Sequence, residues 1–175
     1  MAHSIEENVI AAAQSKVARA EMCWGQNHPK LVKELQNLSD LYLVLEKYEE
    51  AKPIYWRILD IQYRLYGSTH FNNAETLLSL GELHEAQDCV QIAEQFYLGA
   101  LWIIDQTPAE SGSDLAGRIL LKLYGLYKLA GKIEKIPSLE MRLYAFLKRE
   151  HGNIDRTIPK LPQFAAAAVA PLAVA

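Results

Sequence analysis

The sequence predicts an all-α solenoid, in which helical hairpins stack on one another in chain order. The first observation is a repeat, because residues 28–69 return at 70–111 with a constant offset of 42 in the numbering. The second is that apolar side chains within each repeat recur at three- and four-residue spacing, which is typical of amphipathic helices. The third is that 50% of the residues are hydrophobic, enough for a continuous core.

Equivalent positions in the two copies carry the same side chains. Eight pairs whose numbers differ by 42 are His28 and His70, Leu35 and Leu77, Leu38 and Leu80, Leu41 and Leu83, Ala51 and Ala93, Tyr55 and Tyr97, Leu59 and Leu101, and Ile61 and Ile103. The apolar members are predicted core residues. His28 and His70 lie at unit junctions, where we expect them to cap helices.

The chain opens with a predicted helix that begins after the capping-box pattern of Ser4 and Glu7. Gly25 follows the end of this helix, and the same offset of 42 leads from it to Gly67. Glycine in this place is typical of a left-handed helix cap. Residues 1–27 are therefore predicted to be the second half of a preceding unit.

Each of the next two units is predicted to be a helical hairpin. Unit one covers residues 28–69, with helices over about 30–45 and 48–65. Pro53 lies near the start of the second helix, where a lost amide donor costs little, so we expect a small bend without a break. Unit two covers residues 70–111 with the same pair of helices.

The third unit, residues 112–155, is the least regular. Its best offset from unit one is 85, and its helices are expected over about 115–130 and 133–150. Residues 156–175 form an apolar tail rich in alanine and proline. Because its uncharged part, residues 161–175, falls short of the roughly 20 residues that cross a bilayer and is interrupted by Pro171, we expect no membrane span.

Composition argues against several classes of partner. Lys and Arg number 18 and Asp and Glu 21, so the net charge of −3 gives no attraction for nucleic acid or anionic membranes. The N-terminus has no signal-peptide pattern. Cys23 and Cys89 have neither a paired spacing nor a histidine partner pattern, so we expect reduced thiols in a cytoplasmic protein.

No catalytic set is apparent, and we expect no enzyme, metal or cofactor. The sequence has no phosphate-binding glycine loop and no nucleophile elbow. His84 and Asp88 lie four apart on one predicted helix and could hold a metal, but His84 occupies the repeat position of Tyr42, so we interpret it as a packing residue. Trp56 and Trp102, on second helices, are also interpreted as packing residues.

The first unit resembles the tetratricopeptide repeat family, in the 42-residue form of kinesin light chains. The residues that carry the likeness are His28-Pro29, Leu35-Gln36-Asn37-Leu38, Leu41-Tyr42, Lys47-Tyr48-Glu49-Glu50-Ala51-Lys52-Pro53-Ile54-Tyr55, Ile58-Leu59, Ile61 and Gly67. The resemblance covers about residues 5–152. It implies a right-handed α-solenoid of about three hairpins plus an N-terminal helix, and a role as a scaffold or adaptor in protein–protein interaction.

In that family the first helix of each hairpin lines a concave groove that binds a peptide or partner protein. Carried onto this chain, the groove positions are Lys33, Gln36, Asn37 and Asp40 in unit one, Glu75, Ser79 and Glu82 in unit two, and Arg118, Lys122 and Lys128 in unit three. Asn37 matches the family asparagine that binds a ligand backbone, whereas Ser79 and Lys122 replace it later. The family's lysine–asparagine carboxylate clamp is not reproduced. Acidic unit two and basic unit three predict a partner with basic and acidic portions in matching order.

The last predicted helix leaves alternatives open. Its apolar stripe, Leu139, Leu143, Phe146 and Leu147, has no fourth unit to cover it. Either the tail folds back over the stripe, or two chains pair there as a homodimer. The favoured function is a partner-binding module; the alternatives are a self-assembling structural protein and a regulatory subunit that docks on an enzyme.

Overall fold

The computed structural model describes residues 2–107 and 113–151, which form seven α-helices and no strand. The helices are α1 (Ala2–Trp24), α2 (Pro29–Val44), α3 (Tyr48–Tyr66), α4 (Phe71–Ala86), α5 (Val90–Gln106), α6 (Ser113–Leu129) and α7 (Ile136–His151), with a short 3₁₀ helix η1 (Ile133–Lys135) before α7. The predicted all-α fold is therefore confirmed.

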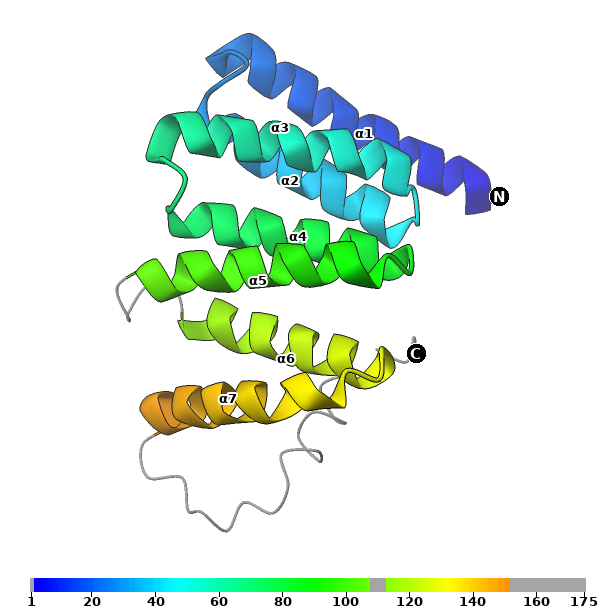
Figure 1. The fold of residues 1–175 in the computed structure, drawn as a ribbon. Coiled ribbons are helices and arrows are strands. Elements are labelled where there is room, and N and C mark those ends of the chain that lie inside the picture. Colours follow the sequence, from blue (N-terminus) through cyan, green and yellow to red (C-terminus); the bar gives the residue numbers. More distant parts are fainter. Residues whose placement is uncertain (1, 108–112, 152–175) are drawn as a thin grey trace.

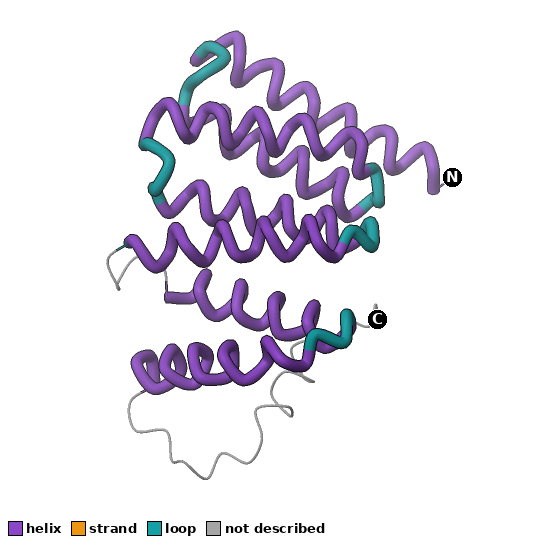
Figure 2. Tube along the Cα trace, in the orientation of Figure 1, coloured by secondary structure: helices purple, strands orange, loops and turns teal. Residues whose placement is uncertain are grey.

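The helices stack in chain order, from α1 at one end to α7 at the other (Figure 1). Each helix packs against its neighbours in sequence, and α4 also contacts α6 across the intervening second helix. The connections that the structure describes are short loops (Figure 2). We call α2, α4 and α6 the first helices and α3, α5 and α7 the second helices of the three hairpins.

The core runs along the stack as two clusters that meet at α4. One cluster joins α1, α2 and α3 to α4, and the other joins α4 and α5 to α6 and α7. Leu77 packs against both, which makes the core continuous. The predicted core pairs are buried in both units, except that Leu41 and Leu77 are only partly covered.

The turn inside each hairpin is closed by the same backbone hydrogen bond. The amide nitrogen after the turn donates to a carbonyl oxygen at the end of the first helix. The N–O distance is 2.8 Å from Lys47 to Tyr42, 2.9 Å from Cys89 to His84 and 2.9 Å from Lys132 to Tyr127. The residue before each donor has positive φ, of 56° in Glu46, 56° in Asp88 and 68° in Gly131. The turn thus recurs at the same two offsets, 42 and 85, that relate the units in the sequence.

Histidines cap the first helices of units one and two, as predicted. The Nδ1 atom of His28 accepts a hydrogen bond from the amide of Lys30 at 3.2 Å, and Nδ1 of His70 accepts from Asn72 at 3.3 Å. Each bond provides a partner for one of the amide donors that a helix start leaves free. Both histidine rings also stack on an aromatic residue at the end of the preceding helix.

Two local expectations differ in detail from the structure, and a third holds. The opening helix begins at Ala2, so Ser4 lies inside it and the predicted capping box is wrong. Gly67 has the expected positive φ of 84°, but its ψ of 170° lies outside the left-handed helical region. Pro53 lies within an unbroken α3, as expected.

The apolar stripe of α7 faces inward, contrary to the expectation of an open end. Leu139 and Leu143 are buried, and Phe146 and Leu147 pack against the same cluster as α6. Phe146 lies so close to Gly117 of α6 that a Cβ there would come within 2.8 Å of the ring. The tail, residues 156–175, lies outside the described residues, and this stripe does not need it as a cover.

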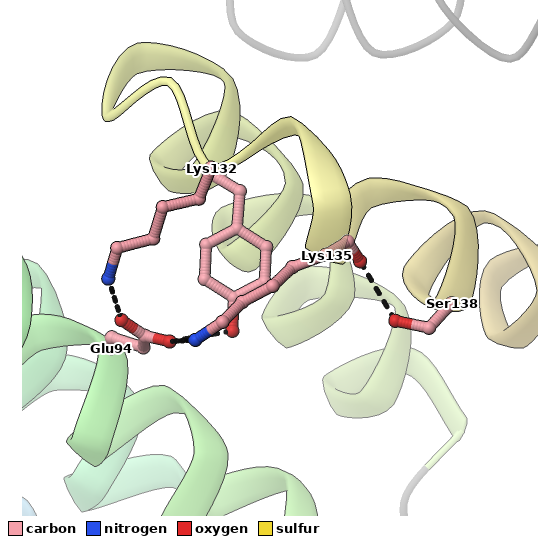
Figure 3. A network of polar contacts seen from close by, with 5 residues as sticks. Glu94, Lys132, Lys135 and Ser138 are labelled. Carbon is pink, nitrogen blue, oxygen red and sulfur yellow. Dashed lines mark hydrogen bonds and ion pairs between the residues drawn. The ribbon is translucent and has the colours of Figure 1, made fainter.

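A buried carboxylate ties the third hairpin to the second. Glu94 of α5, only 7% exposed, accepts hydrogen bonds from Lys132, from Lys135 at 2.6 Å and from the Tyr127 hydroxyl at 2.9 Å. Figure 3 shows Glu94 between the two lysines, with the Ser138 hydroxyl on the Lys135 carbonyl. Burial alone would raise the pKa of Glu94, but the bonds from Lys132, Lys135 and Tyr127 outweigh it and lower the pKa to about 2.

Candidate partner-binding surface

The ten predicted groove residues lie on the three first helices, and all of them reach solvent to some degree. Lys33, Asn37, Asp40, Arg118 and Lys128 are exposed, while Gln36, Glu75, Ser79, Glu82 and Lys122 are half-buried. We call these ten residues the first-helix surface. Helical spacing of three and four residues places most of them in one stripe along each helix.

The Asp40 carboxylate accepts a hydrogen bond from a side chain in the protein interior. Tyr55, fully buried on α3, donates its hydroxyl to Oδ1 of Asp40 at 2.6 Å. Burial by the surrounding helices raises the pKa of Asp40, the bond from Tyr55 lowers it, and the charges of Glu82 and Arg118 act in opposite directions. Side chains from α2, α4 and α6 therefore share one electrostatic environment at Asp40.

The equivalent tyrosine of unit two finds a different acid. Tyr97, fully buried on α5, donates to Oε2 of Glu85 at 2.5 Å. Gly81 makes room for this ring, since a Cβ there would collide with the Tyr97 ring carbons. Glu85 could not be predicted from the repeat because unit one carries Leu43 at that position, and only the structure shows that the Tyr97 hydroxyl reaches it.

Lys122 changes the predicted charge pattern of the surface. Its Nζ lies 3.2 Å from Glu82 and 3.4 Å from Glu85, so it joins α6 to α4. The expected contrast between acidic unit two and basic unit three is therefore partly neutralised within the protein. In the described part of the chain, the side chains of Lys33, Asn37 and Arg118 have no hydrogen-bond or ion-pair partner.

The third hairpin ends its stripe on an apolar residue. The repeat offset of 85 takes Val44 to Leu129, which directly follows Lys128. Val44 and Leu129 are 78% and 82% exposed, and Ala86 at the matching place in α4 is also exposed. The first-helix surface is therefore bordered by exposed apolar side chains at the ends of its helices.

The structure shows where the residues considered for metal binding or ligand contact lie. His84 is buried and stacks on Phe96, as the packing interpretation predicted, and the described residues contain no group of three or more metal-binding side chains. Trp56 is 48% exposed but contacts Phe96 edge-on, which supports its interpretation as a packing residue. Trp102 is 55% exposed and has no ring contact among the described residues, so that interpretation is not supported for it. Among the helices in the described ranges, none could cross a bilayer.

Comparison with solved structures identifies the architecture. A crystal structure of BtubC (BKLC) from P. vanneervenii superposes with a TM-score of 0.75 at 20% identity, over 90% of this chain and 64% of that one. The fold is that of TPR-like repeats. A putative kinesin light chain of Podosopora anserina with nearly identical TPR-like repeats gives a TM-score of 0.71 at 16% identity, over 90% of this chain and 72% of that one.

A variant form of the Podosopora protein gives a TM-score of 0.69 at 16% identity, over 86% of this chain and 70% of that one. The predicted resemblance to kinesin-light-chain-like repeats is thus confirmed for the fold. No protein-family model and no curated protein matches the sequence. This TPR-like chain spans less than two thirds of the length of BtubC.

Proposed function

We propose that this protein is a non-enzymatic interaction module that binds a peptide or partner protein through its first-helix surface. The working units are a half repeat at residues 1–27 and hairpins at 28–69, 70–111 and 112–155. The observation that carries the proposal is that the charges of Glu82 on α4 and Arg118 on α6 both act on the Asp40 carboxyl of α2, so polar side chains of three successive first helices lie within electrostatic reach of one another. A surface shared by three helices can follow an extended or helical partner segment.

The chemistry of the partner follows from which charges are already paired. Lys122 pairs with both Glu82 and Glu85, so its one positive charge partly offsets their two negative charges. Asp40 keeps one carboxylate oxygen free of Tyr55. Arg118 has no partner within the described residues. We therefore infer a segment that offers a basic group near Asp40 and an acidic group near Arg118, with complementarity acting on rate and specificity.

The proposal places the protein in the cytoplasm as a scaffold or adaptor without affinity for nucleic acid. Its net charge of −3 and the absence of an apparent catalytic set support it. The apolar stripe of α7 suggested a homodimer, but this stripe packs on α6. It therefore no longer supports homodimerisation through α7. A regulatory subunit docking on an enzyme would use the same first-helix surface and is a special case of the proposal.

The test compares a surface variant with a control of the same charge. Asn37→Ala combined with Arg118→Glu changes two exposed side chains that lack internal partners, whereas Arg19→Glu makes the same charge reversal at an exposed residue of α1, outside the surface. Partners captured from native extract by the parent are identified, and a peptide from the contacted segment is titrated against all three proteins. We expect the double variant to bind at least about tenfold more weakly, or about 1.4 kcal/mol.

Equal affinity of the parent and the Asn37→Ala, Arg118→Glu protein would reject the first-helix surface as the binding site. A loss that is matched by Arg19→Glu would reject it as well, because a general charge effect would then explain the result. Circular dichroism of the three proteins checks that the helices are intact.

A further inference from the structure

His84 lies at the junction between units one and two, at one end of a row of three aromatic rings. It is 8% exposed on α4, and its ring stacks on Phe96 of α5 with centroids 5.3 Å apart and planes 8° apart. Phe96 in turn meets the Trp56 ring of α3 edge-on at 6.0 Å. The three rings thus connect the second helix of unit one to both helices of unit two.

The imidazole is held in a place that suits only its neutral form. Its Nδ1 atom is buried and has no hydrogen-bond partner among the described residues. The charged groups that act on it come from α3: Lys52 opposes a positive charge, and Glu49 favours one less strongly. The Glu49 carboxylate is shared with Lys52 at 3.7 Å and with the Gln87 amide at 3.3 Å.

Among the described residues, the other elements around His84 offer no compensating acid. α5 presents the uncharged ring of Phe96, and the acid of α4 next to His84, Glu85, bonds to Tyr97 and to Lys122 of α6. Asp88 lies beyond the helix end and is exposed. A proton on His84 would therefore create a buried cation beside Lys52, which is costly without a partner.

The matching positions of the other hairpins carry tyrosines. Tyr42 accepts a hydrogen bond from Gln14 at 2.8 Å, and Tyr127 donates to Glu94 at 2.9 Å. Tyrosine titrates near pH 10, whereas histidine titrates near 6.5. Of these three positions, only the one in unit two carries an imidazole.

We propose that His84 makes the junction between units one and two sensitive to acid, because protonation of its buried ring loosens the packing of α3 on α4 and α5. The direction follows from linkage. Burial, and then Lys52, lower the pKa of His84 below its ordinary 6.5. A junction in which α3 has separated from α4 and α5 therefore binds the proton more readily than the packed junction. The stability that neutral His84 contributes to the junction is fully present above pH 6.5, and it falls as the pH drops below that value.

The experiment measures amide hydrogen exchange of α3 and α4 in the full chain at two pH values, about one unit above and about one unit below the ordinary pKa of histidine. The rates are corrected for the intrinsic dependence of exchange on pH. We expect parent protein to lose protection at the lower pH. His84→Tyr, which installs the residue of the other two units, should abolish that loss. His70→Asn, which keeps a good helix cap, should retain it.

Two results would overturn the proposal: a parent whose protection does not change with pH, or a His84→Tyr protein that loses as much protection as the parent. Lys52→Gln provides an independent check if the tyrosine ring is not accommodated. Without the Lys52 charge the protection lost on acidification should shrink, and an unchanged loss would contradict the mechanism. Glu94 does not interfere, because its pKa lies near 2.

Discussion

The two junctions between hairpins occupy equivalent places and use different chemistry. Between units one and two, the rings of Trp56, Phe96 and His84 meet without an ion pair to His84. Between units two and three, Glu94 is surrounded by Lys132 and Lys135 and by a tyrosine hydroxyl (Figure 3).

The repeat relates these groups position by position. Glu94 of unit two corresponds to Lys52 of unit one, and Tyr127 of unit three corresponds to His84 of unit two. One helical template thus fixes where the hairpins touch but not which forces act there. A junction of packed rings depends on close contact between them, whereas a buried carboxylate depends on the groups that pair with it.

Removing the carboxylate should have the largest effect. Glu94→Ala leaves the Tyr127 hydroxyl without its partner and frees both lysines, so we expect a loss of about 3 kcal/mol, measured by urea denaturation. Gln95→Ala, at an exposed neighbour on α5, is the control and should stay within about 0.5 kcal/mol. Equal midpoints for the two variants would show that the second junction does not depend on this network.

Acid should weaken the same junction by a similar or smaller amount. The pKa of Glu94 falls from 4.5 to about 2 on folding, so its contribution is complete above pH 4.5 and is lost as the pH falls toward 2. A shift of this size corresponds to up to about 3 kcal/mol. Urea midpoints between pH 5 and 2 should fall for the parent and much less for Glu94→Gln; parallel curves would contradict the assignment.

Removing the central ring of the first junction should cause the smallest loss of stability. Phe96 is only partly buried, so Phe96→Ala should cost about 1–2 kcal/mol, less than a fully buried phenylalanine. The variant should also lose protection in α3 and α4 while α6 and α7 keep theirs, as hydrogen exchange can show. Equal loss in α6 and α7 would mean that the junctions do not behave as separate contacts.

Much of the architecture could be predicted because it depends on periodic burial. Leu35, Ala51 and Tyr55 and their counterparts in unit two indicate the core by spacing alone, and His28 and His70 indicate the helix starts. The inward stripe of α7 was misjudged for a physical reason. A single amphipathic stripe can be satisfied by the helix before it, and sequence spacing does not reveal that α6 already covers it.

The candidate site was less accessible to sequence reasoning. Repeat spacing placed Asp40, Glu82 and Arg118 on first helices, but not the pairing of Lys122 with two glutamates across helices. Such pairing depends on the distance and stagger between helices, which a pattern along one helix does not contain. The same limit hid Glu85 as the acceptor for Tyr97.

The sequence by itself determined that helical hairpins form and repeat at a fixed period, because backbone hydrogen bonding and apolar spacing are local properties. The tertiary structure alone decided which charges neutralise one another and which junction holds a carboxylate or a histidine in its interior. Those outcomes depend on contacts between residues such as Glu94 and Lys132, which are far apart in the chain and meet only when the hairpins stack.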